Sequence, residues 1–222
     1  MKKIKVDKDS HGTIAINWAV IAILICCTAV FLNNHPYIYI PVIAILLAFA
    51  FFVFWFHRIP DRDIPKGDSK MVTSVADGKV VIVDRVYEKE YFKDDRIQVS
   101  VYMDFFDVHT NFWPMDGEIS YYKYHPGKYL LAFLPKASEK NEHSSTVIRN
   151  EHGEILFRQI AGTFARRIVC YSKEGDKVER GKQCGIIKFG SRIDIFLPLD
   201  ADVKVKEGEF TRACETVIAE LK

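Results

Sequence analysis

The feature that most constrains this chain is a long segment without charge. From Ser10 to His57 there is no Asp, Glu, Lys or Arg, and most of the side chains are apolar. A helical hairpin buried inside a soluble protein is the alternative interpretation, but so long an uncharged stretch argues against it. The sequence therefore predicts a membrane anchor joined to a globular domain.

The anchor divides into two hydrophobic passes. Residues 14–32 and 38–56 are each 19 residues long, enough to cross roughly 30 Å of hydrocarbon as a helix. A polar turn at residues 33–37, with a helix-breaking proline at Pro36, separates them. A cleaved signal peptide fits poorly, because the first segment is long, lacks a small-residue cleavage site and precedes a second pass.

The basic residues that flank the passes predict the orientation of the anchor. Four lysines precede the first pass and three basic residues follow the second, whereas the connecting turn has no Lys or Arg. These flanking residues are Lys2, Lys3, Lys5 and Lys8, then Arg58, Arg62 and Lys66. Because positive flanks stay on the cytoplasmic side, we expect a multi-pass anchor in the cytoplasmic membrane with the globular domain facing the cytoplasm.

These observations divide the chain into four parts. We expect a basic cytoplasmic N-terminus at 1–13, a transmembrane helical hairpin at 14–56, a linker at 57–70 and one globular domain at 71–222. Pro60, Pro65 and Gly67 discourage regular structure in the linker. Its basic residues are expected to contact anionic lipid head groups.

Charge and cysteine content exclude some classes of function. The 31 basic and 29 acidic residues leave a net charge of +2, which is not the strong basic excess of a nucleic-acid-binding protein. Five cysteines, an odd number without a Cys-x-x-Cys pair, predict reduced thiols in a cytoplasmic domain. No spacing of histidines, His125 and His143 included, completes a recognisable zinc site, so no metal is expected.

The globular domain is expected to be mainly β. Residues 79–83, 97–102, 168–171 and 193–197 are short β-branched or aromatic runs bounded by Gly, Asp and Pro. A short helix is possible only at 162–167.

The sequence Lys-Glu-Gly-Asp at 173–176 returns 33 residues later as Lys-Glu-Gly-Glu at 206–209. This repeated pattern resembles the paired hairpins of lipoyl- and biotinyl-carrier domains. The resemblance predicts a compact β-sandwich or barrel-sandwich.

Six further motifs, taken in order, resemble the short, membrane-anchored phosphatidylserine decarboxylases, which are pyruvoyl-dependent. Each motif alone is ordinary, but the series covers most of the globular domain. The motifs are Ala76-Asp77-Gly78-Lys79-Val80; Phe106-Asp107-Val108-His109-Thr110-Asn111 with Pro114 and Gly117; Lys136-Ala137-Ser138 with Asn141-Glu142; Gln159-Ile160-Ala161-Gly162; Ala165-Arg166-Arg167-Ile168-Val169; and Phe189-Gly190-Ser191-Arg192.

Two positions depart from the pattern of that family. Val75 replaces a common proline, which alters the turn before Asp77. Phe112-Trp113 replace residues that are often Arg and a small residue, and the long bacterial form has a second histidine where Phe112 stands. A mechanism with two histidines therefore cannot be assumed.

The resemblance implies a proenzyme that cuts itself between Gly190 and Ser191. Ser191 would become a covalent pyruvoyl group that forms a Schiff base with phosphatidylserine and yields phosphatidylethanolamine and CO2. Such a ketone is chemically suitable, because decarboxylation of an amino acid leaves a carbanion that needs an electron sink. His109 is the family-matched base for the Ser191 hydroxyl and Asp77 the carboxylate that holds it. The mature protein would pair chain 1–190 with chain 191–222 at the lipid bilayer, with a homo-oligomer possible.

Alternatives remain for these residues and for the whole chain. Gly190-Ser191 alone is usually a turn, Asp77 alone an ordinary turn residue, and His109 alone a hydrogen-bonded histidine at a strand edge. The aromatic residues 105, 106, 112 and 113 form either core or an apolar lip for a lipid. The substrate could instead be an archaeal-type ether lipid. A non-catalytic, membrane-tethered lipoyl-like carrier or adaptor is disfavoured because Lys188 is not at a hairpin tip.

Overall fold

The computed structural model describes residues 5–130, 140–163, 168–188 and 191–222 of the chain. These residues fall into two compact units, Met1–Asp61 and Arg62–Lys222, which are described separately. The boundary lies inside the segment that the sequence identifies as a linker. The globular unit contains every described residue of the six sequence motifs.

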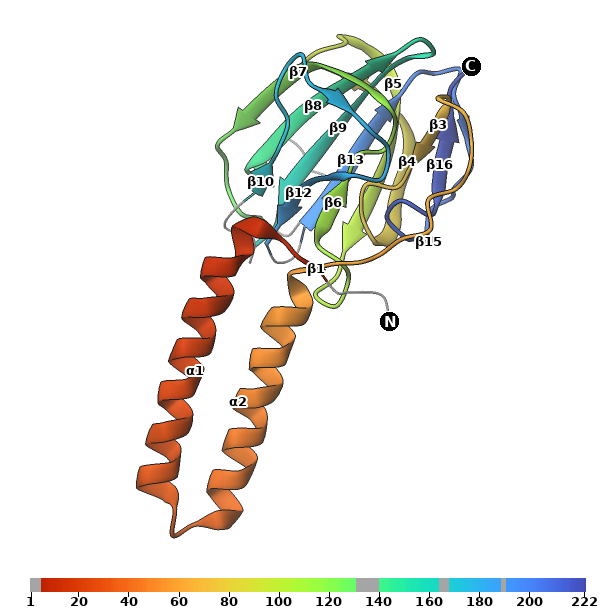
Figure 1. Cartoon of the computed structure of the whole chain (residues 1–222). Helices are drawn as coiled ribbons and strands as arrows, with labels where there is room; N and C mark the ends of the chain where they lie inside the picture. Colours follow the sequence, from red (N-terminus) through yellow and green to blue (C-terminus); the bar gives the residue numbers. More distant parts are fainter. Residues whose placement is uncertain (1–4, 131–139, 164–167, 189–190) are drawn as a thin grey trace. The chain divides into compact units, whose positions relative to one another are not determined.

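The first unit is an antiparallel pair of apolar helices, α1 (His11–Leu32) and α2 (Pro36–Phe56). A 3-10 turn, η1 (Lys8–Ser10), precedes α1. Both helices begin a few residues earlier than the sequence predicts. Pro36 stands in the first turn of α2, where a backbone N–H would have no acceptor within the helix, so its absence removes no hydrogen bond. The indole of Trp18 donates to the carbonyl of Ala50 at 3.2 Å, which joins the two helices. The predicted pair of apolar helices is confirmed (Figure 1).

By length and composition, two segments of this unit could cross a membrane. They are Lys8–Phe31 and Pro36–Phe56. The prediction of an irregular linker is wrong at its first residues, because β1 (Lys5–Val6) pairs antiparallel with β2 (Arg58–Ile59). The two ends of a helical hairpin emerge side by side, so their extended backbones can satisfy each other's N–H and C=O groups.

The second unit is built from three antiparallel sheets (Figure 1). The largest has eight strands in the order β11-β7-β8-β9-β13-β5-β4-β15, and the smaller two have the orders β10-β12-β6 and β14-β16-β3. The strands are β3 (Met71–Thr73), β4 (Gly78–Glu88), β5 (Asp94–Met103), β6 (Thr110–Phe112), β7 (Gly117–His125), β8 (His143–Asn150), β9 (Gly153–Ala161), β10 (Ile168–Cys170), β11 (Lys177–Val178), β12 (Gln183–Ile187), β13 (Ser191–Leu197), β14 (Asp202–Val203), β15 (Phe210–Thr211) and β16 (Val217–Glu220).

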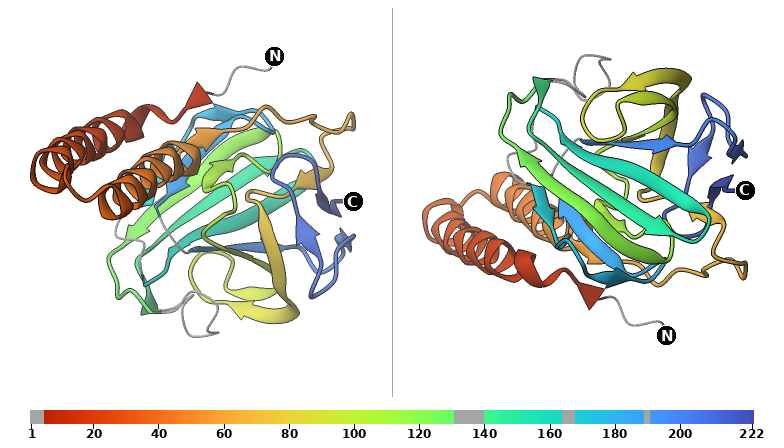
Figure 2. Two further views of the ribbon diagram at one scale, coloured as in Figure 1. Left: turned by 90° about the horizontal axis from the view of Figure 1, so that it is seen from below. Right: turned by 90° about the horizontal axis from the view of Figure 1, so that it is seen from above.

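The large sheet curls into a half-barrel, as Figure 2 shows. Register shifts between Val80 and Ile82 in β4 and between Ile119 and Tyr121 in β7 add local bends. Its inner face packs with residues of the two small sheets in one buried core. Ile193, Ile195 and Leu197 of β13 belong to this core together with Ile187 of β12 and Ile218 of β16. The mainly β prediction is confirmed.

The sequence repeat corresponds to a structural repeat. Gly175 and Gly208 have φ values of 85° and 91°, and each precedes an edge strand of the large sheet, β11 and β15 respectively. The strands that follow, β12 and β16, are each the central strand of a small sheet. The two copies therefore take corresponding places at opposite edges of the half-barrel. The helix considered for 162–167 falls largely outside the described residues.

Candidate active site

Ser191 is the first residue of β13, in the middle of the large sheet. It stands opposite Met103 of β5 on one side and Ala161 of β9 on the other. Because side chains alternate along a strand, Ser191 shares the inner face with Ile193 and Ile195, which lie in the core. The side chain is fully buried, and its Oγ has no hydrogen-bond partner among the described residues. Gly190 lies outside the described residues.

His109 lies just before β6 and is also fully buried. Its main-chain oxygen accepts from the N–H of Ile187 at 3.2 Å, which places it beside the end of β12, the strand that leads toward Ser191. Its Nδ1 lies 3.1 Å from the carbonyl oxygen of Asp107. Since a carbonyl only accepts, Nδ1 carries the proton, and in the neutral ring Nε2 carries the basic lone pair.

A buried polar network lies on the same inner face. Asn111 donates to the sulfur of Met103 at 3.9 Å and accepts from Gln159 at 2.8 Å. Gln159 in turn accepts from the hydroxyl of Ser144 at 2.9 Å. Met103 is the β5 residue opposite Ser191. The network therefore extends from β8 to the neighbourhood of Ser191, and every member of it is hydrogen-bonded.

Asn141 links another of the sequence motifs to the start of β13. Its side-chain amide donates to the carbonyl of Ala161 at 2.7 Å and to that of Leu130 at 2.8 Å. Ala161 is the β9 residue opposite Ser191. Asn111, Asn141 and Gln159, from three motifs, thus converge on one end of the large sheet. The Lys136-Ala137-Ser138 and Ala165-Arg166-Arg167 segments lie outside the described residues.

Asp77 lies in the turn before β4 and has partners that the sequence does not suggest. One carboxylate oxygen accepts from Arg62 at 2.5 Å and the other from the N–H of Ala213 at 2.7 Å. No hydrogen bond joins Asp77 to His109, and both residues are described. The two motifs are nevertheless connected, because the N–H of Phe112 donates to the carbonyl of Val75 at 3.0 Å.

Arg62, the partner of Asp77, lies in a different environment from the one that the sequence predicts. It was expected to contact lipid head groups from the linker, but only 6% of its side chain is exposed and it pairs with Asp77. A second carboxylate, that of Glu215, lies 3.9 Å away. Two acidic partners within the globular unit explain why this arginine is buried there. Basic character near an anchor does not by itself reveal such an ion pair.

Arg192 forms a second buried ion pair, directly after Ser191. Its guanidinium donates to both oxygens of Asp194 at 2.6 and 3.1 Å, and both side chains are fully buried. By strand alternation these residues face outward, opposite to Ser191. The alternation of Arg and Asp within an apolar run is the sequence signal that could have identified this pair.

The aromatic residues near His109 divide between two environments. Phe112 and Trp113 are buried, and Trp113 packs edge-to-face on Phe157 with ring centroids 6.0 Å apart. Phe106 is 77% exposed. The core interpretation therefore holds for residues 112 and 113, whereas Phe106 has the exposure that an apolar lip requires.

Comparison with known proteins gives a consistent result. The family model described as phosphatidylserine decarboxylase matches residues 49–219. A phosphatidylserine decarboxylase proenzyme of Amoebophilus asiaticus is 51% identical over 170 residues, covering 76% of this chain and 75% of the relative. One of Cytophaga hutchinsonii is 47% identical, covering 81% of each chain. One of Bacteroides thetaiotaomicron is 40% identical, covering 100% of this chain and 97% of its own.

The enzyme class and substrate follow from these matches. The family is pyruvoyl-dependent, and its members are carboxy-lyases made as proenzymes. The sequence resemblance and the comparisons agree, and the carrier or adaptor alternative is not supported. The chain belongs to the phosphatidylserine decarboxylase family and converts phosphatidylserine to phosphatidylethanolamine.

Proposed function

We propose that Ser191 is the residue from which this chain makes its pyruvoyl group, by cutting its own backbone after Gly190. The observation that carries the proposal is the buried Ser191 Oγ, which has no hydrogen-bond partner among the described residues. A buried hydroxyl without a partner is costly in an ordinary strand. It suits a hydroxyl that reacts during maturation.

The cleavage can be written with all atoms accounted for. The Ser191 hydroxyl attacks the Gly190 carbonyl, and the peptide rearranges to an ester, which frees the Ser191 amine. Loss of the Ser191 α-proton and elimination of the Gly190 carboxylate break the chain and leave dehydroalanine at position 191. Addition of water and loss of ammonia then leave a pyruvoyl group at the start of the small chain.

His109 is the proposed base for the first step and a proton donor or acceptor afterwards. It is buried, and the Asp107 carbonyl orients the ring so that Nε2 carries the lone pair. A pyruvoyl group at position 191 would supply the electron sink that decarboxylation needs, through a Schiff base with the amine of phosphatidylserine. The buried surroundings of Ser191 would exclude water from that step.

We also propose Asp77 as a site residue, because its motif resembles that of the family. Its bonds to Arg62 and Ala213 make a purely structural role the competing explanation. Asp77→Asn separates the two, because the amide oxygen can still accept from Ala213 while the charge is lost. Slow self-cleavage with an unchanged unfolding temperature supports a role in proton transfer. A lowered unfolding temperature with normal cleavage supports structure alone.

We also propose that the two apolar helices span the cytoplasmic membrane with both ends in the cytoplasm. The helices have the length and composition for this, and basic residues flank them on the outer ends only. An anchor of this kind suits an enzyme whose substrate is a lipid. Exposed Phe106 is proposed to contact the lipid near the head group.

For the fold, we propose a lipoyl-like relationship between the two halves of the sheet. The corresponding positions of β11 with β12 and of β15 with β16 support it. The sequence repeat that precedes each pair of strands supports it as well.

Intact-mass measurement of Ser191→Ala tests the central proposal. We expect the wild type to give two chains, 1–190 and 191–222, and Ser191→Ala to remain one uncut 25.6 kDa chain without decarboxylase activity. Ser120→Ala, a half-buried serine on β7, is the matched control and should cut normally. The small chain should resist Edman sequencing, because its first residue has no amine.

Two results would overturn the proposal. One is an uncut chain that still decarboxylates phosphatidylserine, and the other is a cut at a different peptide bond. Assaying an ether-linked phosphatidylserine analogue beside the ester lipid tests the remaining substrate alternative.

A further inference from the structure

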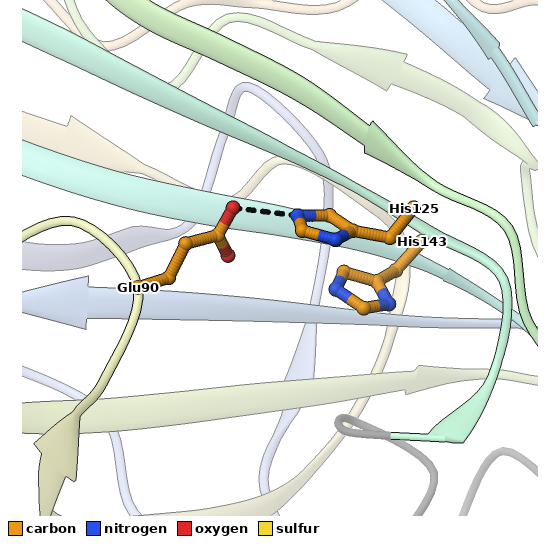
Figure 3. A group of neighbouring side chains, drawn as sticks. All are labelled: Glu90, His125 and His143. Atoms are coloured by element: carbon orange, nitrogen blue, oxygen red, sulfur yellow. Dashed lines mark hydrogen bonds and ion pairs between the residues drawn. The ribbon is translucent and has the colours of Figure 1, made fainter.

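Three side chains of the kind that bind metals meet on the outer face of the large sheet. Glu90 lies in the turn between β4 and β5, His125 ends β7, and His143 begins β8 directly opposite His125. One ligand atom from each, a carboxylate oxygen or a ring nitrogen, lies within 4.8 Å of the other two. Figure 3 shows the two rings stacked, with Glu90 reaching toward them.

Hydrogen bonds fix the orientation of two of these groups. Nδ1 of His143 lies 2.7 Å from the carbonyl of Asn141, so Nδ1 carries the proton and the lone pair of the neutral ring is on Nε2. Glu90 accepts at Oε2 from Ser145 at 2.7 Å and from Arg158 at 2.9 Å. Its Oε1 faces Nε2 of His125 at 2.6 Å. Metal ligands in proteins are commonly held by outer hydrogen bonds of this kind.

The turn that carries Glu90 is itself held in shape. The buried carboxylate of Glu88 accepts from the N–H groups of Glu90, Tyr91 and Phe92 at 3.0, 2.8 and 2.9 Å. It also accepts from Arg158 at 2.6 Å, so one guanidinium serves two carboxylates. The cluster keeps one negative charge in excess, which favours a bound cation. A rigid supporting shell is what a binding site needs.

We propose that Glu90, His125 and His143 bind a divalent transition-metal ion, with zinc as the best match. Two imidazole nitrogens and one carboxylate oxygen are a donor set typical of zinc with three protein ligands, where water takes the fourth position. About a quarter of the His125 side chain is exposed, which leaves access for the ion and the water. On binding, the proton that Nε2 of His125 shares with Glu90 moves to Nδ1 of the same neutral ring, so that Nε2 and the carboxylate oxygen both become free for the ion.

The position of the site indicates what the ion does. His125 and His143 are the last residue of β7 and the first of β8, so a shared ion ties both ends of the connection 126–142 to the β4–β5 turn. His143 pairs with Ile160 of β9, and Ile160 pairs in turn with Arg192 of β13. His143 and Arg192 therefore lie in one row across the sheet. That row faces away from Ser191. The ion therefore stabilises this end of the sheet and takes no part in the cleavage.

Zinc binding by the full-length protein in detergent tests the proposal. After removal of metals with a chelator and dialysis against Zn²⁺, we expect about one ion per chain by elemental mass spectrometry and a raised unfolding temperature. His125→Ala and His143→Ala should each lose the ion. His152→Ala is the matched control, because His152 lies in the β8–β9 turn at the other end of β8 and should leave binding unchanged.

A second variant and a second metal keep the test decisive. If the histidine variants misfold by circular dichroism, Glu90→Gln decides, because it keeps the shape but should weaken zinc binding at least tenfold. Cobalt(II) in place of zinc should give a spectrum without thiolate charge transfer. Three results would each overturn the proposal. They are loss of zinc from the wild type, retention of zinc by a folded His143→Ala variant, and a thiolate band that assigns the metal to cysteine.

Discussion

Arg62 and Asp77 form an ion pair that is almost closed to solvent, with 6% and 15% of their side chains exposed. Removing one partner of a buried pair leaves a charge that is neither hydrated nor paired, at a cost of roughly 3 kcal/mol. We therefore expect Arg62→Ala to lower the stability of the globular unit by about this amount. Thermal unfolding in detergent would measure the loss.

Arg85 offers the matched control for that variant. It pairs with Asp95 at 2.7 Å, but 65% and 41% of the two side chains are exposed. Exposed pairs of this kind contribute roughly 0–1 kcal/mol, so Arg85→Ala should be nearly neutral. Equal effects of the two variants would show that the Arg62 pair is also effectively solvated.

The thiols of the globular unit should differ in reactivity. Burial raises the pKa of Cys214 to about 12, with nearby Asp77 and Glu215 adding to the effect and Arg62 opposing it. Burial also raises the pKa of Cys184 well above its usual value. A thiol with a pKa of about 12 is roughly one part in ten thousand thiolate at pH 8, and the thiolate is the reactive form.

Alkylation by iodoacetamide at pH 8 would measure this difference. We expect partly exposed Cys170 to be labelled first, and Cys184 and Cys214 only after denaturation. Raising the pH toward the pKa of Cys214 should increase its labelling as the thiolate fraction grows. Rapid labelling of Cys214 in the folded protein at pH 8 would contradict the prediction.

Candidate residues could be selected from the sequence where they lie within a short motif. Ser191 and His109 stand inside short motifs, so the local pattern selects them as candidates, and their roles stay predictions. The partners of Asp77 and the grouping of Glu90, His125 and His143 could not be inferred, because the tertiary fold brings these residues together from distant segments. Spacing along the chain carries no signal for contacts of that kind.

At the scale of the element, Gly185 controls how closely β12 approaches β10. A Cβ at this position would lie 2.2 Å from the carbonyl oxygen of Val169 and 2.9 Å from the side chain of Gln159. Neither neighbour can move easily, because one is backbone in a paired strand and the other belongs to the buried network with Asn111. We expect Gly185→Ala to displace β12 and block self-cleavage.

Gly12→Ala is the control, because nothing lies within 4 Å of its Cβ position. Gel analysis of self-cleavage in both variants would give the comparison. Normal cleavage by Gly185→Ala would show that the strand tolerates the displacement.

The elements could be predicted where the residue pattern is simple. The two helices and the β4, β5, β10 and β13 runs are apolar or β-branched, and each was expected close to its observed position. Strands β7, β8 and β9 were not expected. In β7 the only aliphatic residue is Ile119, and in β8 the polar residues His143 to Thr146 are buried by tertiary contacts that no local pattern reveals.

For the whole molecule, the orientation in the membrane is open to a direct test. A reporter fused after Lys222 should be active only in the cytoplasm, because the flanking Lys and Arg residues keep both ends of the hairpin there. The matched control is the same reporter inserted in the turn at Asn34, which should be active only on the opposite side. Activity of the Lys222 fusion outside the cytoplasm would reverse the orientation.

The proposed cut should leave the two chains firmly associated. The bond between Gly190 and Ser191 lies between β12 and β13, so cutting it breaks no strand. The small chain, 191–222, supplies β13, which is hydrogen-bonded to β5 and β9 of the large chain on its two sides. It also supplies β15, paired with β4, and β16, paired with β3.

Burial strengthens this association further. Ile193, Ile195 and Leu197 are fully buried in the core, and each such side chain contributes roughly 1.5–3 kcal/mol. We therefore expect the mature protein in detergent to elute as one species by size exclusion and to separate into two chains only in a denaturing gel. Uncut Ser191→Ala, which should elute at the same volume, is the control. Release of the small chain without denaturant would mean that β13 is not held in the sheet as the pairing with β5 and β9 requires.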